Sequence, residues 1–521
     1  MGNPFQNSVY FVGIKGTGTS ALAELMREAG LKVSGSDTSE AFYTDAILKE
    51  LNISFYENFD AKHITSDIDI VIHSAAYSAE TNPELAEAIK QNIPVVKYPD
   101  ALGLWSEGFD SAGICGVHGK TTTTALAGVL MRAVNIPAQI LVGAAVAGFG
   151  GRSTLTVGSK YFVAETCEYR RHFLAFKPKH IILTSVECDH QDCFPDFESI
   201  RDAFIEYCLL LPPGGEIIYC ADDSGACEVV QLVMQSVKKE GREIKLVPYG
   251  FTASGDYRIV SYNVKNERGV FSLAGIPGEI KLQIPGRHQA LNAAAAIALA
   301  AILAEKEQNA ACGSFSEENV NAIKTALENF TGSKRRSEII GRAGGIIFMD
   351  DYGHHPTAIK TSLAGIKSFY PSRRLIVSFM SHTYTRTAAL LDEFAACFND
   401  ADFVFLHKIY SSAREKYSGG VNGMTLYERV KAAKQGTHTA DGCDNADNGD
   451  AARNGGGADT VFYFEEPDDA FRRLLEILKP GDIFLTLGAG NNWPLGEKLL
   501  NYFNSIDAGK PGESEWKEEA S

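Results

Sequence analysis

One stretch near residue 115 has the residue types and spacing of a phosphate-binding loop. Residues 113–124 read GICGVHGKTTTT, in which two glycines flank Val117 and His118 and are followed by Lys120 and four threonines. A glycine turn between a strand and a helix points backbone N–H groups and the positive end of the helix dipole at phosphate oxygens. The Lys120 ammonium could then reach the β- and γ-phosphates, and the Thr121 hydroxyl could bind Mg2+. The stretch therefore predicts a nucleotide site; its alternative is a glycine turn that caps an ordinary helix.

A second glycine turn lies close to the N-terminus. Residues 13–20 read GIKGTGTS, and Asp37 follows at the end of the next strand-like segment. Backbone amides near Ser20 could receive a diphosphate, and Asp37 could bind a ribose or a base. The segment 73–76 ends another apolar run and adds small polar groups such as Ser74. A nicotinamide-dependent oxidoreductase would explain this turn, but it would leave the lysine loop without a use.

Carboxylates and one imidazole follow two apolar segments in the middle of the chain. Glu165 ends the first of these segments, and Glu187, Asp189 and His190 follow the second. Such groups at the strand ends of a phosphate-loop domain suit divalent metal chemistry. A metal held between two phosphates needs few protein ligands, so Thr121, Glu165 and His190 would suffice. The alternative for the histidine is a purely structural role.

Other polar clusters adjoin predicted helices and strands. His288 and Asn292 are four residues apart and share one helical face, from which an asparagine amide could contact an adenine edge. The alternative there is the polar first turn of a buried helix. Three further clusters, 333–338, 350–356 and 381–387, gather arginines, aspartates and histidines. Arginine forks suit phosphates and carboxylates, whereas the alternative is scattered surface charge.

The composition excludes several classes of protein. The 521 residues are 45% hydrophobic and 22% charged, which is typical of a soluble globular protein. With 49 basic and 65 acidic residues the net charge is −16, which disfavours nucleic acid and anionic membranes as partners. The ten cysteines form no CxxC pair, which favours free thiols in a reducing compartment. We therefore expect a cytoplasmic protein.

The order of strand-like and helix-like segments predicts an α/β protein with mainly parallel sheets. Residues 1–108, 109–332 and 333–507 have separate characters and are predicted to be three domains. Between about 436 and 460 the composition falls to Gly, Asn, Asp and Ala, which predicts a disordered insertion. The polar residues 508–521 are predicted to be a loose tail.

Taken in order, these motifs resemble those of the Mur ligases of peptidoglycan synthesis. The motifs are GxxGxGxS…GSD, GxHGKTTT, E-x-x-E-Y/S, E-x-DH, GxHxxxNAxAA, RR-x-E, DDYxHHPT and HxYTRT, and they span nearly the whole chain. The resemblance implies an N-terminal Rossmann-like domain for a UDP-sugar and a central P-loop-type ATPase domain with a mainly parallel sheet. It also implies a mobile C-terminal Rossmann-like α/β domain that completes the site.

The resemblance is greatest to the family members that join L-alanine to the lactyl carboxylate of UDP-N-acetylmuramate, with ATP and Mg2+. It implies that the carboxylate takes the γ-phosphate of ATP and that the amine of L-alanine then displaces phosphate from the acyl phosphate through a tetrahedral intermediate. Because a carboxylate repels a polyphosphate, Mg2+ and Lys120 must neutralise charge.

The resemblance also assigns residues to each subsite. The predicted ATP-binding residues are Gly116, His118, Gly119, Lys120, Thr121, Thr122, His288, Asn292, Arg336 and Asp351. The predicted UDP-sugar-binding residues are Gly16, Thr17, Gly18, Thr19, Ser20, Asp37 and Ser74. The predicted amino-acid-binding residues are Tyr352, His354 and Arg386, and the predicted metal ligands are Thr121, Glu165 and His190. The predicted catalytic residues are Lys120, His190, His354 and Arg386.

Some positions depart from the family pattern, and they concern the substrate side more than ATP. They are Lys15, Val117, Cys167, Ser185 and the pair 380–381. A sister ligase that reattaches recycled murein tripeptide to the same UDP-sugar is the alternative. The run ETCEY…FPDFESI favours that enzyme, whereas HTYTRT favours the L-alanine enzyme. We expect a monomer or a weak homodimer.

Overall fold

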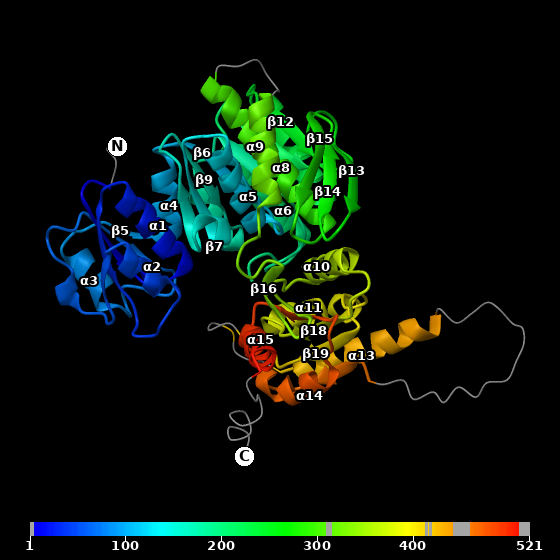
Figure 1. Ribbon diagram of the computed structural model, residues 1–521. Helices are drawn as coiled ribbons and strands as arrows, with labels where there is room; N and C mark the ends of the chain where they lie inside the picture. The colour runs from blue at the N-terminus through cyan, green and yellow to red at the C-terminus, as the bar shows by residue number, and fades with distance from the viewer. Residues whose placement is uncertain (1–4, 309–314, 412–414, 416–418, 441–458, 510–521) are drawn as a thin grey trace, which may run out of the picture.

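Three α/β bodies make up the protein (Figure 1). The computed structural model describes residues 5–308, 315–411, 415, 419–440 and 459–509. The elements fall into an N-terminal body (8–106), a central body (110–328) and a C-terminal body (338–507). Figure 1 shows the N-terminal body beside the central body and the C-terminal body below it. The predicted α/β class with mainly parallel sheets is confirmed.

The N-terminal body is a parallel five-stranded sheet with strand order β3-β2-β1-β4-β5. Its strands are β1 Ser8–Val12, β2 Lys32–Ser36, β3 Ser54–Tyr56, β4 Ile70–His73 and β5 Val95–Lys97. Its helices are α1 Thr17–Glu28, α2 Thr44–Glu50, α3 Pro83–Lys90 and α4 Tyr98–Ser106, with the 3-10 turn η1 Ala61–His63. Strand β1 is buried throughout, as expected for a central parallel strand that has helices on both faces.

The central body is built on a seven-stranded sheet with order β12-β11-β10-β6-β9-β7-β8, in which only the β7–β8 pair is antiparallel. Its strands are β6 Asp110–Cys115, β7 Ala138–Val146, β8 Arg152–Thr156, β9 Tyr161–Glu165, β10 His180–Leu183, β11 Glu216–Cys220 and β12 Lys245–Tyr249. Its helices are α5 Lys120–Ala133, α6 Phe197–Leu209, α7 Ser224–Lys239, α8 Arg287–Gln308 and α9 Glu317–Glu328, with 3-10 turns η2 Ala147–Phe149 and η3 Tyr169–Ala175.

A three-stranded antiparallel sheet is attached to the central body, and the sequence did not predict it. The strands are β13 Ile259–Val264, β14 Gly269–Leu273 and β15 Ile276–Leu282. One face is buried against the central core, which includes Phe271 and Ile280. The strands are hard to predict because their burial pattern is irregular and both ladders contain a register shift.

Helix α8 forms the core of the central body. Its alanines allow it to pack closely on α5, and Ala293–Ala296 are fully buried. Within the described residues, α8 is the one helix long and apolar enough to cross a membrane, by length and composition. However, 78% of that window is buried inside the protein, which is the environment of a core helix.

The C-terminal body has a six-stranded sheet with order β16-β17-β21-β18-β19-β20, of which the β16–β17 pair is antiparallel. Its strands are β16 Glu338–Ala343, β17 Ile346–Asp351, β18 Leu375–Phe379, β19 Phe403–Leu406, β20 Val461–Tyr463 and β21 Ile483–Leu487. Its helices are α10 Pro356–Phe369, α11 Tyr384–Ala389, α12 Leu391–Ala396, α13 Gly423–Ala440, α14 Phe471–Ile477 and α15 Trp493–Asp507, with the 3-10 turn η4 Pro467–Ala470.

The predicted insertion at 436–460 needs a correction at its start. Helix α13 continues to Ala440, so residues 436–440 are helical rather than irregular. Residues 441–458 lie outside the described part of the chain, as does most of the predicted tail. Helical propensity carried through from the preceding turns explains why composition alone misplaced this boundary.

The strand β7 anchors the segment that joins the central and C-terminal bodies. Ser333 forms an antiparallel bridge with Val146, and the N–H of Lys334 donates to the carbonyl of Ala145 at 2.8 Å. Immediately afterwards, Arg335 adopts a left-handed φ of 59°. The chain is therefore fixed to the central sheet up to the point where it turns into the C-terminal body.

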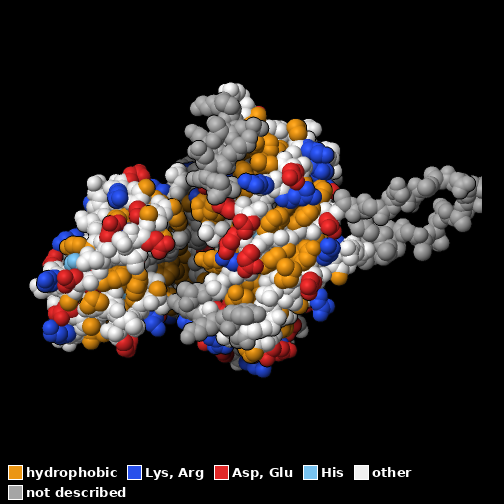
Figure 2. Space-filling view, turned by 90° about the horizontal axis from the view of Figure 1, so that it is seen from below, with side chains coloured by type: hydrophobic (Ala, Val, Ile, Leu, Met, Phe, Trp, Pro, Cys, Tyr) orange, Lys and Arg blue, Asp and Glu red, His pale blue; other side chains and the backbone are white. Residues whose placement is uncertain are grey.

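Acidic, basic and hydrophobic side chains are interspersed on the face of the molecule that Figure 2 shows. The same view shows the surface hollowed between the N-terminal body at the left and the rest of the protein. On this face the net charge of −16 is therefore not gathered into one large acidic patch.

Candidate active site

The lysine-containing glycine turn joins β6 to α5, as predicted, and its glycines are required by close contacts. Gly116 has φ +129°, and a Cβ there would lie 2.1 Å from the Oγ1 of Thr184. Gly119 caps α5 with φ +81°, and a Cβ there would lie 2.6 Å from the Oδ1 of Asn292. Only glycine avoids both the strain and the overlap. The turn therefore places the N-terminus of α5, with Lys120 as its first residue, against α8.

Lys120 is paired with a buried carboxylate. Its Nζ lies 3.0 and 2.9 Å from the two carboxylate oxygens of Glu168, whose side chain is 2% exposed. Burial disfavours the ammonium, but Glu168 outweighs this effect and raises the pKa of Lys120 above its ordinary value. Burial also disfavours ionised Glu168, but Lys120 and His190 hold the pKa of Glu168 below its ordinary value. Both groups are therefore charged at neutral pH.

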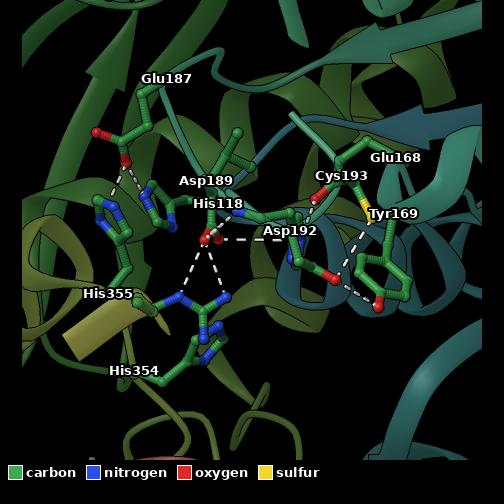
Figure 3. Close-up of polar contacts among 12 residues, drawn as sticks. His118, Glu168, Tyr169, Glu187, Asp189, Asp192, Cys193, His354 and His355 are labelled. Carbon is green, nitrogen blue, oxygen red and sulfur yellow. Dashed lines mark hydrogen bonds and ion pairs between the residues drawn. The ribbon is translucent and has the colours of Figure 1, made fainter. Parts of the chain in front are cut away.

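The predicted metal ligands take part in two separate polar contacts near Lys120 and Glu168. The hydroxyl of Thr121 donates to Oε1 of Glu165 at 3.1 Å, and His190 places Nε2 3.3 Å from Oε1 of Glu168. Figure 3 shows Glu168 beside Tyr169 and Asp192. The hydroxyl and carboxylate oxygens at Thr121 and Glu165 are the kind of donor that Mg2+ prefers. These two residues fit a phosphate-bound magnesium ion.

His288 and Asn292 of α8 make different contacts at the cavity. His288 accepts from the side-chain amide of Gln289 at 2.9 Å, and its buried Nδ1 has no hydrogen-bond partner among the described residues. Burial lowers the pKa of His288 to about 4, so the ring is neutral at pH 7. Asn292 accepts from Thr123 at 3.3 Å and thereby ties α8 to α5. The unpaired imidazole nitrogen fits a polar ligand such as a nucleotide base.

The C-terminal body brings its predicted residues to the same place. Arg336 approaches the Oγ1 of Thr121 at 3.3 Å and lies over the ring of Tyr352, 5.2 Å from its centroid. Asp351 is 5% exposed and accepts hydrogen bonds from the N–H groups of Gly353 at 2.6 Å and Ser337 at 2.8 Å. The Nδ1 of His354 lies 3.0 Å from the carbonyl of Tyr352. Burial, followed by the charge of the nearby Arg386, lowers the pKa of His354 well below its ordinary value.

An ion pair joins the central and C-terminal bodies. Arg386 of α11 donates from Nε and Nη2 to the same oxygen of Asp189, at 3.0 and 2.9 Å. The two side chains are 7% and 4% exposed. Burial disfavours the carboxylate, but Arg386 outweighs that effect and holds the pKa of Asp189 below its ordinary value. The guanidinium that was predicted to bind the amino acid thus also holds the two bodies together.

These residues line one cavity of about 1020 Å³ between the two bodies. Its walls include the following residues that the sequence predicted: His118, Gly119, Lys120, Thr121, Thr122, Glu165, His190, His288, Asn292, Arg336, Asp351, Tyr352, His354 and Arg386. Gly116 lies behind this wall, where it allows the close approach of Thr184. Left-handed φ angles at His190 (56°), Ser337 (48°) and Thr383 (68°) add backbone strain of the kind that concentrates at functional sites.

Comparison with known proteins agrees with this arrangement. Three family models match the chain: "Mur ligase family, catalytic domain" at residues 8–110, "Mur ligase middle domain" at 114–300 and "Mur ligase, glutamate ligase domain" at 335–490. A UDP-N-acetylmuramate–L-alanine ligase of Treponema pallidum is 47% identical over 95% of this chain and 96% of its own length. The protein belongs to the Mur ligase family.

Solved structures share the fold of this Mur ligase. A UDP-N-acetylmuramate–alanine ligase of Thermotoga maritima matches with a TM-score of 0.68 and 21% identity, covering 96% of this chain and all of the other. A murein peptide ligase of Psychrobacter arcticus matches with a TM-score of 0.61 and 20% identity, covering 95% of this chain and 98% of the other. At these identities the likeness shows a common fold.

The residues predicted to bind the UDP-sugar lie at one edge of the N-terminal sheet of this Mur ligase. They follow β1, β2 and β4, which are neighbours in the sheet, so that their carboxyl ends meet. Gly16 caps α1, Asp37 follows β2 and Ser74 follows β4, while the first turn of α1 holds Thr17, Gly18, Thr19 and Ser20. These residues are not part of the wall of the 1020 Å³ cavity.

Many polar groups of this N-terminal turn are used within it. Asp37 is 5% exposed and accepts from the N–H of Lys15 at 2.7 Å and from the N–H of Thr38 at 2.8 Å. The hydroxyl of Thr19 donates to the carbonyl of Gly13 at 2.7 Å. The side chain of Lys15, which departs from the family pattern, is fully buried beside Glu57 and Asp45. Asp37 and Lys15 therefore fix the shape of the turn.

Sequence reasoning missed the partner residues at the cavity of this Mur ligase. Glu168 received no role, although it stands three residues after Glu165 in the E-x-x-E motif. In the linear pattern Glu187 and Asp189 are only acids at a strand end, and His355 is only one histidine of a polar cluster. Their partners come from other elements, so the contacts cannot be found in a linear pattern. The eight cysteines in the described part of the chain are free thiols, as the sequence predicted.

Proposed function

We propose that this Mur ligase joins L-alanine to the lactyl carboxylate of UDP-N-acetylmuramate, with cleavage of ATP to ADP and phosphate. The observation that carries the proposal is one cavity lined both by a fixed cation, Lys120, at a phosphate loop and by Arg386 of another body. A relative of that name at 47% identity over 95% of the chain supports the choice of substrates.

Charge balance explains why the groups are arranged in this way. An oxygen of the lactyl carboxylate attacks the γ-phosphorus of ATP, and the bond from that phosphorus to the oxygen of ADP breaks. Lys120 offsets the negative charge that the lactyl carboxylate, the γ-phosphate and the departing ADP bring together. Mg2+, held by Thr121 and Glu165, would supply further charge stabilisation at the phosphates.

The second step joins the amino acid to the activated carboxyl group. The amine nitrogen of L-alanine attacks the acyl carbon, the carbon–oxygen bond to phosphate breaks as phosphate leaves, and the nitrogen releases a proton to water as the amide forms. Arg386 would bind the α-carboxylate, through its second amino group or by sharing the guanidinium with Asp189. His354, which is kept neutral by burial, could accept a hydrogen bond from the amine.

We also propose the domain roles and the setting. Residues 1–108 would bind the UDP-sugar, 109–332 would bind ATP, and 333–507 would bind the amino acid and close the site. The free cysteines and the requirement for ATP favour the cytoplasm. The protein would act as a monomer or a weak homodimer, without nucleic acid or a membrane.

A direct experiment separates this function from its alternatives. The protein is incubated with UDP-N-acetylmuramate, ATP and Mg2+, and L-alanine, glycine or murein tripeptide is offered in parallel while phosphate release and product mass are recorded. L-Alanine should give the fastest product, and phosphate release should require both the UDP-sugar and the amino acid. Preference for tripeptide would identify the recycling ligase, and equally fast ATP hydrolysis by the protein alone would exclude ligase chemistry.

A further inference from the structure

A cluster of two histidines and one glutamate lies at the seam between the central and C-terminal bodies. His118 comes from the phosphate loop, Glu187 from the segment after β10, and His355 caps the N-terminus of α10. One potential ligand atom of each residue lies within 4.8 Å of the other two. Figure 3 shows both imidazole rings turned toward the same end of Glu187.

One of the spacings among these atoms is close to that of a metal centre. In tetrahedral zinc sites with bonds of about 2.0–2.1 Å, neighbouring ligand atoms are roughly 3.3 Å apart. The Nδ1 of His355 lies 3.5 Å from Oε1 of Glu187, and the Nε2 of His118 contacts that same oxygen. His118 lies closer to that oxygen than two ligands of one ion do, so its ring would have to draw back for all three donors to bind one ion.

The surroundings support the glutamate and leave room for an ion to enter. The other carboxylate oxygen of Glu187 accepts from the hydroxyl of Thr357 at 3.0 Å, which orients the group as outer residues do in metal sites. The side chains of His118 and Glu187 are 28% and 29% exposed, and that of His355 is 7% exposed. His118 and His355 line the wall of the cavity. Binding of a cation to Nδ1 of His355 would break one long hydrogen bond, which the N–H of Thr357 donates to this nitrogen at 3.4 Å.

We propose that His118, Glu187 and His355 form a binding site for a transition-metal cation, with Zn2+ as the best-fitting ion, separate from the magnesium site at Thr121 and Glu165. Two imidazoles and one carboxylate suit zinc, whereas magnesium prefers an all-oxygen set. Because two ligands come from the central body and one from the C-terminal body, the ion would bind tightly only when the two bodies are together. The inference does not depend on the identity of the ligated substrates.

The test measures zinc binding to the full-length protein without nucleotide or substrate. Zinc is titrated against a chromophoric chelator, for the wild-type protein and for His355→Ala, in the presence of excess Mg2+. The wild type should hold one tight equivalent of zinc, and His355→Ala should bind that equivalent more than about tenfold more weakly, because loss of even an outer-shell partner costs that much. His172→Ala, which alters a histidine outside the cluster, should match the wild type.

Two further variants keep the result unambiguous. Glu187→Gln removes the carboxylate with little change in shape, so it should lose the same equivalent even if His355→Ala folds poorly. Glu165→Gln alters the magnesium ligands and should retain the tight zinc. Equal zinc affinity in the wild type, His355→Ala and Glu187→Gln would overturn the proposal, as would loss of the tight zinc only in Glu165→Gln. Neither result would bear on the ligase reaction, which is measured separately with Mg2+.

Discussion

Two glycine turns in this Mur ligase look alike in sequence and differ in what surrounds them. The turn after β1 places Lys15 between Asp45 and Glu57 of its own body, and its buried Asp37 accepts backbone N–H groups. The turn after β6 places Lys120 against Glu168 at the wall of a cavity that a second body closes. A glycine turn thus provides a backbone shape, and the charges brought by other elements decide what chemistry follows.

The largest expected effect separates the two lysines. Lys120→Ala should reduce turnover by roughly a hundredfold or more, because a charge-stabilising group worth about 3 kcal/mol is lost. Lys15→Ala should instead lower the free energy of unfolding by about 1–3 kcal/mol, with turnover at saturating substrate much less affected. Steady-state kinetics and chemical denaturation of both variants check this contrast. Normal turnover in Lys120→Ala would mean that the two turns do not differ in the way proposed.

The next effect concerns the residue that links the bodies. Arg386→Ala should raise the KM for L-alanine by an amount equivalent to about 1.5–3 kcal/mol, the worth of a hydrogen bond to a charged group, while the KM for ATP changes much less. Asp189→Asn is the matched control, since it keeps the guanidinium but removes its buried partner. If the double variant Asp189→Asn/Arg386→Ala regained L-alanine affinity, Arg386 would act only by holding Asp189. Equal weakening of ATP would assign Arg386 to phosphate.

A smaller effect appears as a pH dependence of stability. Burial lowers the pKa of His288 to about 4 in the folded protein, so between about pH 6.5 and 4 the unfolded chain takes up a proton that the folded protein does not. His288 should therefore reduce stability as the pH falls through this window, by at most about 1.4 kcal/mol per pH unit. The difference in unfolding free energy between the wild type and His288→Gln, measured from pH 7 to pH 4, isolates the contribution of His288. An unchanged difference across the window would show that the ring is solvated.

The smallest expected effect is a near absence of change. Deleting residues 441–458 and joining the ends with a short linker should leave both melting temperature and turnover nearly unchanged, because that stretch has few apolar residues and surface loops are tolerant of length. Extending the deletion through Thr460 should cost more, since the carbonyl of Thr460 accepts from the N–H of Val404 in the C-terminal sheet. A large loss from the shorter deletion would show that the segment docks on the protein.

The sequence predicted most of what depends on local pattern. The central strands β1, β10 and β18 are mostly apolar and fully buried, and the helix after Gly286 is marked by its alanines. Apart from Gly116, the residues that the resemblance assigns to ATP, the amino acid and the metal all line one cavity, and their roles stay predictions.

What escaped prediction depends on contacts between distant segments. Asp189 and Arg386 are 197 residues apart, and Thr357 and Glu187 are 170 apart, so their pairing is a property of the folded chain. The three-stranded sheet at 259–282 escaped because its register shifts blur the alternation that a strand normally shows. Helix α13 extends further than composition predicts because a helix begun by stronger helix formers can continue through a turn of weaker ones.

The anchoring of Ser333 and Lys334 to β7 has a mechanical consequence. A C-terminal body that is held to the central sheet up to this point and then turns sharply at Arg335 has a fixed pivot instead of a free tether. Opening of the cavity would then be a rotation of the C-terminal body about this pivot. Arg336, next to the hinge, would travel the shortest arc and stay near the phosphate loop. Arg386 and His355 both belong to the C-terminal body and would leave and return together.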